Sequence, residues 1–143
     1  MSTVKRFEDL RVWKSSRELV KIIYKLSNQG TFQKDYGLRD QIRRAVISVM
    51  SNIAEGFGAG SDAEFVRFLG YSRRSLSEAL SQLYAALDLE YISQLDFDNV
   101  YKMGIETEKQ LNAFISYLIR SKSTKNLRDD SSPYSVNIPS DDL

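Results

Sequence analysis

The 143-residue chain contains no cysteine and no histidine, and these two absences exclude several kinds of site. Without cysteine there is no disulfide framework, thiolate nucleophile or cysteine-bound metal. Without histidine there is no histidine-based serine or cysteine triad, no His-rich zinc site and no Glu-x-x-His di-iron site. Carboxylate, lysine or tyrosine chemistry remains open, and we expect no metal and no cofactor.

Proline and glycine are also scarce, at two and seven residues, which favours long helices over a turn-rich β protein. No apolar run approaches the ~20 residues that span a bilayer. Residues 1–6 lead directly into charged sequence and lack the apolar core of a signal peptide. We therefore expect a cytoplasmic protein with no membrane partner.

The net charge of +1 is unevenly distributed. Residues 5–44 carry eleven Lys/Arg and five Asp/Glu, a balance of +6, and the rest of the chain carries nine and fourteen, a balance of −5. This asymmetry indicates either a surface that faces a polyanion or subunits that meet basic face to acidic face.

Hydrophobic residues recur with helical spacing in four segments, approximately residues 8–28, 37–57, 61–90 and 97–120. A glycine-rich stretch ends the second segment, and Ser61-Asp62-Ala63-Glu64 is a capping box that opens the third. Links of roughly five to ten residues require neighbouring helices to run antiparallel. The predicted fold is all-α, an antiparallel up-down four-helix bundle.

The two ends of the chain differ in composition, which sets the predicted domain boundary. The bundle is assigned to residues 1–121. Residues 122–143 hold both prolines and four acidic residues, and we predict that they form a disordered acidic tail.

A line of polar and small residues runs beside the apolar stripe of the second helix, and the third helix offers a matching line. The two lines comprise Gln41, Ser48, Asn52, Glu55, Ser75, Glu78 and Gln82. If they face each other, Glu55 and Glu78 could share a site for acid/base chemistry. We favour a structural seam that fixes helix register, because no nucleophile, metal ligand set or phosphate loop accompanies the two carboxylates.

Basic residues crowd the first three helices. The candidate phosphate ligands are Lys14, Arg17, Lys21, Arg39, Arg43, Arg44, Arg73 and Arg74. Guanidinium groups bind phosphate bidentately, although a charged row on a helix is more often a solvated face. One copy is not basic enough for tight binding, and a ring of copies would sum the field.

The end of the third helix carries a second apolar line beside its inner face. Its members are Leu80, Tyr84, Leu87 and Tyr91. A helix in a four-helix monomer rarely needs two such lines, and we therefore predict that this line is an oligomer interface.

Several motifs, in order along residues 5–120, resemble the four-helix-bundle family encoded in intervening sequences of bacterial 23S ribosomal RNA genes. Residues 7–14 (Phe-Glu-Asp-Leu, then Val-Trp-Lys) resemble the family's opening, and residues 36–45 continue the match. Residues 48–58 are close to its Ser-Ile-x-x-Asn-Ile-Ala-Glu-Gly signature. The family motif residues, to which we assign a structural role, are Gln41, Ser48, Asn52, Glu55, Gly56, Ser75 and Glu78.

The resemblance implies a bundle that assembles into a closed ring, a pentamer, with no established enzymatic activity. It also implies kinship with accessory subunits of diversity-generating retroelements, which bind nucleic acid and a reverse transcriptase. The expected partners are further copies of the chain, RNA or DNA, and a reverse transcriptase or another protein. Arg73 and Arg74 stand where the family often has a small residue and glycine, so basic charge has moved along the chain.

Three functions follow from these observations. A non-enzymatic, oligomeric, nucleic-acid-binding accessory protein ranks first. A protein interaction scaffold ranks second, and a carboxylate enzyme ranks third.

Overall fold

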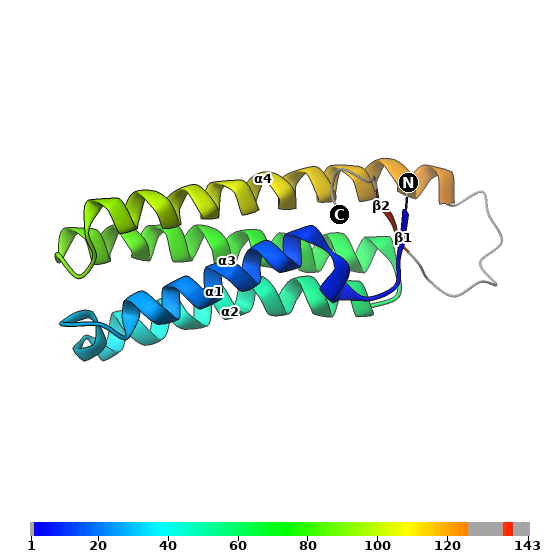
Figure 1. Ribbon diagram of the computed structural model, residues 1–143. Helices are drawn as coiled ribbons and strands as arrows, with labels where there is room; N and C mark the ends of the chain where they lie inside the picture. Colours follow the sequence, from blue (N-terminus) through cyan, green and yellow to red (C-terminus); the bar gives the residue numbers. More distant parts are fainter. Residues whose placement is uncertain (1, 126–135, 139–143) are drawn as a thin grey trace.

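Four helices make up most of the computed structural model, which describes residues 2–125 and 136–138 (Figure 1). The helices are α1 Arg11–Ser27, α2 Tyr36–Gly58, α3 Asp62–Asp88 and α4 Gln94–Lys125. Short 3-10 turns, η1 Phe7–Asp9 and η2 Phe32–Lys34, precede α1 and α2. Two short strands, β1 Ser2–Val4 and β2 Val136–Ile138, pair antiparallel.

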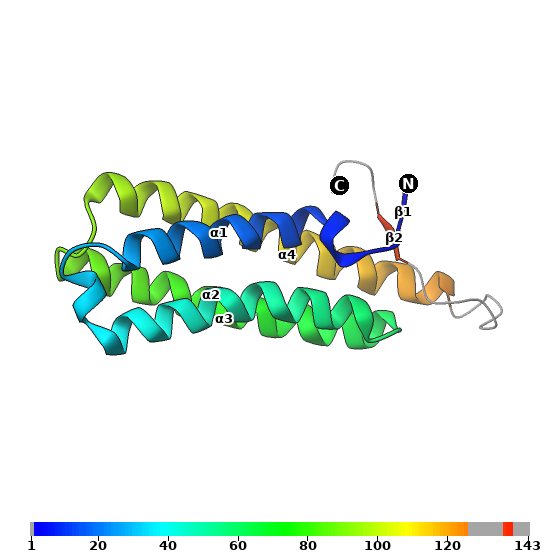
Figure 2. The same ribbon diagram turned by 60° about the horizontal axis from the view of Figure 1, so that its bottom comes forward.

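The helices form a four-cornered antiparallel bundle (Figures 1 and 2). The helix α1 packs against α2 and α4, and α3 packs against the same two neighbours, so α1 and α3 occupy opposite corners. The predicted all-helical bundle is thereby confirmed. Within the described residues, no helix combines the length and apolar character needed to cross a membrane.

The core consists of apolar residues spaced three and four apart on each helix. Ile42, Val49 and Ile53 of α2 and Phe65 and Leu69 of α3 are completely buried. Burial of each such side chain stabilises the fold by about 1.5–3 kcal/mol relative to exposure. The amphipathic spacing seen in the sequence is therefore sufficient to place the helices around one core.

Side chains cap the starts of α2 and α3. The Ser61 hydroxyl accepts a hydrogen bond from the Glu64 amide at 3.2 Å, which confirms that half of the predicted capping box. Asp35 caps α2 in the same way, accepting from the Leu38 amide at 3.1 Å. These caps satisfy amide groups that have no partner inside the helix.

Two short parts of the predicted tail, residues 122–125 and 136–138, form regular secondary structure. The helix α4 continues to Lys125, and Val136 pairs with Val4 in the two-stranded sheet. Val136 is fully buried and Val4 nearly so. A strand of three residues gives too short a pattern to see in an acidic, proline-containing segment. Residues 126–135 and 139–143 lie outside the described residues.

The second apolar line of α3 is largely used inside the protomer, which corrects the view that it is surplus. Leu80 is buried where Gly104 of α4 makes room for it; a Cβ atom on Gly104 would lie 2.6 Å from Leu80 Cδ2. Leu87 is partly buried against the core, and Tyr91 donates a hydrogen bond to Asp35 at 2.9 Å. Tyr84 alone of the four stays well exposed, at 48%.

Candidate nucleic-acid interface

A row of basic residues follows the outer side of α1. Lys14, Arg17 and Lys21 are all exposed, and their spacing of three and four places them on one helix face. Tyr24 extends the row by one more turn toward α2. Lys21 pairs with Glu18 at 3.1 Å, but both side chains are exposed, so the pair contributes little to stability and exchanges readily.

Arg43 of α2 meets the end of this row and is held from two sides. Its Nε donates a hydrogen bond to the Ser27 hydroxyl at 2.8 Å, and its guanidinium lies 4.7 Å from the centre of the Tyr24 ring. Ser27 is completely buried. No carboxylate of the described residues pairs with Arg43, and its two terminal nitrogens are therefore available for a phosphate.

Arg39 lies one turn before Arg43 and, like Arg43, is held by both a hydrogen bond and an aromatic ring. Its guanidinium lies 4.8 Å from the centre of the Tyr36 ring. It donates to the Gln33 carbonyl at 3.0 Å and pairs with Asp40 at the same distance. Only 22% of the Arg39 side chain is exposed, so its position is fixed before any ligand binds.

The other predicted basic residues do not join this group. Arg44 is exposed but lies ~100° around α2 from Arg43. Arg73 and Arg74 belong to α3, at the corner opposite α1. Arg73 donates to Asn112 of α4 at 3.1 Å, and the Arg74 guanidinium lies 6.0 Å from the centre of the Tyr71 ring. We use the term basic face for the row formed by the other five: Lys14, Arg17, Lys21, Arg39 and Arg43.

The polar lines of α2 and α3 do face each other. The Ser75 hydroxyl donates to the Ser48 hydroxyl at 2.9 Å, and the Gln82 amide donates to the Gln41 carbonyl oxygen at 3.3 Å. Asn52 donates to the Ser48 backbone carbonyl at 2.8 Å. The lines therefore form a hydrogen-bonded seam between the two helices.

The register of this seam separates Glu55 from Glu78. Because Ser48 lies opposite Ser75, Glu55 lies opposite residue 68, ten residues or ~15 Å along α3 from Glu78. Both carboxylates are exposed, and Glu78 accepts a hydrogen bond from Gln82 at 3.2 Å. The idea that the two carboxylates share one acid/base site is therefore wrong.

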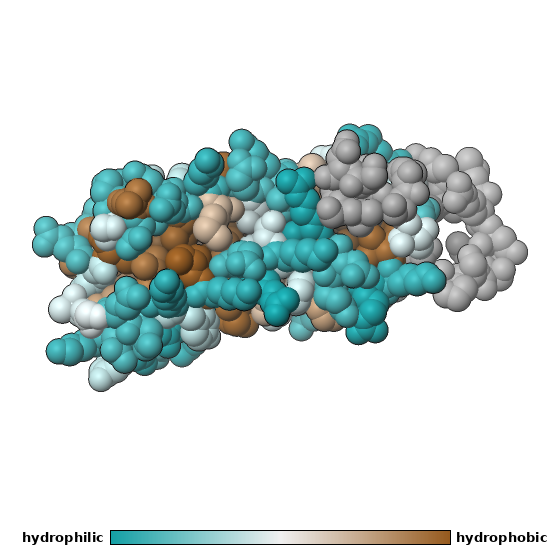
Figure 3. All heavy atoms as spheres, in the orientation of Figure 1, coloured by the Kyte–Doolittle hydropathy of each residue, from teal (hydrophilic) through white to brown (hydrophobic). Residues whose placement is uncertain are grey.

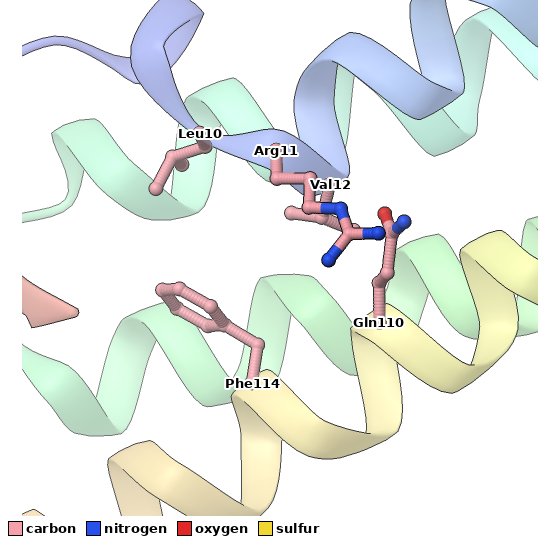
Figure 4. A pocket seen from close by; sticks show the side chains of 5 residues that line it. All are labelled: Leu10, Arg11, Val12, Gln110 and Phe114. Carbon is pink, nitrogen blue, oxygen red and sulfur yellow. The ribbon is translucent and has the colours of Figure 1, made fainter. Parts of the chain in front are cut away.

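One hollow of the bundle is too small for a small-molecule substrate. The cavity shown in Figure 4, where the start of α1 approaches α4, measures only about 10 Å³, which is room for one water. It is lined by Leu10, Arg11, Val12, Gln110 and Phe114. Within the described residues, no group of three Asp or Glu side chains is placed to hold a metal ion.

A much larger and open hollow lies along the start of α1, with a volume of about 600 Å³. Its lining includes Trp13, two members of the basic face, Lys14 and Arg17, and two acidic residues, Glu8 and Glu18. The Arg17 guanidinium lies 5.6 Å from the centre of the Trp13 ring. The basic face thus extends from this hollow to the Arg43 site at the far end of α1.

The sequence match decides the family. Residues 8–113 match the family described as 23S rRNA-intervening sequence protein. The chain belongs to this family. The resemblance drawn from the sequence motifs is thereby confirmed.

A solved structure supports the same assignment. The chain is similar to a protein with unknown function from the S23 ribosomal protein family of Bacteroides thetaiotaomicron, whose crystal structure was determined at 1.70 Å resolution. The two are 27% identical, the similarity covers 73% of this chain and 97% of that one, and the TM-score is 0.67. None of the curated proteins compared with the chain matches it.

The family motif lies mainly at the contact between α2 and α3. Ser48, Asn52 and Ser75 make the seam, and Gly56 lets the backbone of α2 approach Phe68 of α3. The motif therefore accounts for helix pairing. The basic face lies elsewhere, between α1 and α2.

Sequence reasoning missed the residues that position the arginines. Ser27, Gln33 and the rings of Tyr24 and Tyr36 orient Arg39 and Arg43. Tyr24 is visible in the sequence as a residue beside the apolar stripe of α1. Its pairing with Arg43 depends on the α1–α2 register, which the sequence pattern does not reveal.

Proposed function

We propose that this protein is a non-enzymatic, oligomeric accessory protein that binds RNA or DNA through the phosphates that its basic face contacts. The observation that carries this proposal is a row of five cations from two helices, two of them fixed by hydrogen bonds and ring contacts. Cations held in place before binding lose little side-chain freedom when a phosphate arrives.

Affinity for phosphate would come mainly from counterion release. Each phosphate contact to duplex nucleic acid contributes about −0.9 to the slope of log K against log salt concentration. Five contacts per protomer correspond to a slope of about −4.5, which is moderate for one copy. Several copies in one assembly would multiply the contacts, and this is why we include an oligomer, with a five-membered ring as the form implied by the family resemblance.

Exposed apolar residues near the α3–α4 connection support assembly. Tyr84, Leu89 and Leu95 are 48%, 54% and 68% exposed. Tyr84 packs beside Phe97 and Tyr101, with ring centres 4.7 and 5.6 Å away, so this patch is continuous with the core. Apolar surface of this kind is characteristic of a contact with another protein chain.

The non-enzymatic part of the proposal rests on how the polar residues are used. Ser48 with Ser75 and Gln41 with Gln82 hydrogen-bond to each other across α2 and α3, and the two carboxylates, Glu55 and Glu78, are exposed and lie ~15 Å apart along the helices. A Glu55→Gln variant is expected to alter folding stability or assembly, if anything, and to leave nucleic-acid binding intact.

The proposal is tested by comparing two charge variants on structured RNA. Replacing Lys14, Arg17 and Lys21 by Gln should abolish the mobility shift seen at low salt, because it removes three of the five cations. The control replaces Arg73 and Arg74 by Gln; it removes two positive charges from the opposite corner and should shift RNA as the wild type does. Native mass spectrometry of each variant checks that assembly is unchanged. Equal loss of binding in both variants, or no binding by the wild type, would refute the proposal.

A protein interaction scaffold is the second candidate, and the exposed apolar residues favour it. Figure 3 shows apolar atoms exposed between α1 and α4, and a hollow of about 250 Å³ lies between these two helices. Its lining is Ser15, Glu18, Lys102, Met103, Glu106 and Thr107. Under this alternative a Tyr84→Ser variant would lose a protein partner or the assembly, and binding would not depend on salt or on the basic face.

A further inference from the structure

The end of the bundle where α1 meets α2 carries two neighbouring guanidinium groups flanked by two aromatic rings. In spatial order this series reads Tyr36, Arg39, Arg43 and Tyr24. Arg39 and Arg43 lie one turn apart on α2, and Tyr36 lies one turn before Arg39. Tyr24 reaches the series from α1. We refer to these four residues as the stacking ladder.

Both rings of the stacking ladder are accessible. Tyr36 is 65% exposed and Tyr24 is 40% exposed, although each has a guanidinium within 5 Å of its centre. Each ring therefore keeps exposed surface that a flat ligand can reach. The bound cation also restrains the ring, so that less freedom is lost when a flat group stacks on it.

We propose that the stacking ladder binds unpaired nucleotides, with Tyr24 and Tyr36 stacking on bases while Arg39 and Arg43 hold the phosphates between them. This inference rests on the proposed function and specifies its ligand as single-stranded rather than duplex nucleic acid. Aromatic stacking combined with a cationic track is the usual way in which proteins hold single strands without reading their sequence.

A duplex cannot use the rings in this way. Its bases are stacked on one another, and only the edges of the bases and the backbone face outward. A duplex would therefore contact the arginines and lysines of the basic face, and no base would stack on the tyrosine rings. The two ligand forms are separable by experiment for this reason.

A second cluster of tyrosine and arginine side chains lies on α3, but its ring and its arginine are less available to a ligand. There Arg67 and Arg74 flank the ring of Tyr71, at 5.7 and 6.0 Å from its centre. Arg67 donates to the Glu64 carboxylate through both Nε and Nη2, at 3.2 and 2.6 Å, whereas Arg39 of the ladder donates to Asp40 through Nε alone, at 3.0 Å. Tyr71 is also the least exposed of the three tyrosines, at 36%. The more fully paired arginine and the less exposed ring on α3 favour the ladder between α1 and α2.

The test measures the affinity of the full chain for three ligands of equal length and sequence: single-stranded RNA, single-stranded DNA and RNA duplex. Tyr36→Leu and Tyr24→Leu should each weaken binding of the single strands roughly tenfold, which is the size of one lost base–ring contact. Duplex binding should change by less than about twofold, because duplex contacts are to phosphates. Single-stranded RNA and DNA should bind within about threefold of each other, since the ring stacks on a base present in both.

Three controls separate the ladder from folding defects and from the basic face as a whole. Tyr36→Phe and Tyr24→Phe keep the ring and should keep single-strand affinity. Tyr71→Leu, in the competing cluster, should leave it unchanged. Arg43→Gln should weaken single strands and duplex alike. Circular dichroism and native mass must match the wild type for each variant used.

The outcomes distinguish this inference from the proposed function. Salt-dependent binding that requires Arg43 but ignores Tyr24 and Tyr36 would overturn the stacking ladder and leave the proposed function standing. Loss of single-strand binding in Tyr71→Leu instead would overturn it as well. Failure of the wild type to bind any of the three ligands would overturn both.

Discussion

At the scale of single residues, Gly56 shows most clearly why the family motif contains a glycine. An added Cβ would lie 2.7 Å from the Cβ of Phe68 and 2.9 Å from Cδ1 of Phe65. The first of these atoms is anchored to the backbone of α3 and cannot swing away. Any side chain at this position would therefore push α2 and α3 apart, and the seam of Ser48 and Ser75 depends on their close approach.

We expect Gly56→Ala to destabilise the fold by about 1–3 kcal/mol, because it overpacks the contact between α2 and α3. Gly58→Ala is the matched control: it lies in the last turn of the same helix and a Cβ there meets nothing within 4 Å. That variant should be neutral or more stable by about 0.4–1 kcal/mol, because alanine restricts the unfolded chain. Urea unfolding of the three proteins measures both effects, and an equal effect of the two substitutions would contradict the packing argument.

Tyr91 gives a residue-scale expectation for pH. Its hydroxyl donates to Asp35, and this hydrogen bond, together with partial burial and the carboxylate charge, raises the pKa of Tyr91 above its usual value near 10. A raised pKa in the folded state means that the stabilisation is fully present below pH ~10 and is lost as the pH rises through the folded pKa.

Tyr91→Phe should therefore be less stable than the wild type at pH 8, and the difference between the two should shrink above pH 10. Tyr36→Phe serves as the control, because the described structure gives the Tyr36 hydroxyl no hydrogen-bond partner. Urea midpoints at both pH values measure the effect. A difference between wild type and Tyr91→Phe that stays constant with pH would argue that the hydrogen bond to Asp35 does not form.

At the scale of secondary-structure elements, the helices follow from the sequence and the strands do not. The helix of residues 61–90 could be predicted because its capping box and its row of Phe65, Leu69 and Leu76 agree with each other. The strand β2 has three residues and gains its stability from pairing with β1, which lies more than a hundred residues away in sequence. Contacts of such long separation leave no local pattern, so the strand β2 could not be predicted from the sequence.

The strand pair is expected to contribute to stability through its buried valines. Val136→Ala removes two buried carbon atoms and should destabilise the fold by about 1–2 kcal/mol. Asn137→Ala, the neighbouring control, removes an exposed hydrogen bond to Thr3 and should change stability by less than about 0.5 kcal/mol. Thermal or urea unfolding distinguishes them, and an unaffected Val136→Ala protein would show that β2 does not dock on the bundle in solution.

At the scale of the whole molecule, the family motif and the basic face lie on different pairs of helices. The helices α2 and α3 carry the family motif and hold the fold together, and α1 and α2 present the basic face. Charge counting along the sequence located the basic half of the chain, residues 5–44, but spread the candidate ligands over three helices. The fold reduces them to one face because α1 and α3 sit at opposite corners.

The orientation of that face could not be obtained from the sequence for a physical reason. Whether Arg43 meets Tyr24 and Ser27 depends on how far α1 slides along α2, and the apolar spacing of each helix fixes which face is buried but not this offset. The same limit applied to Glu55 and Glu78, whose matching periodicity suggested a shared site that the actual register rules out.

The most direct test of the central claim is the dependence of RNA affinity on salt concentration, measured for the wild type and for Arg43→Gln. We expect the logarithm of the association constant of the wild type to fall steeply with the logarithm of the salt concentration. The slope for Arg43→Gln should be shallower by about one unit, because one phosphate contact is lost. A wild-type affinity that does not change with salt, or a slope that Arg43→Gln leaves unaltered, would contradict this claim.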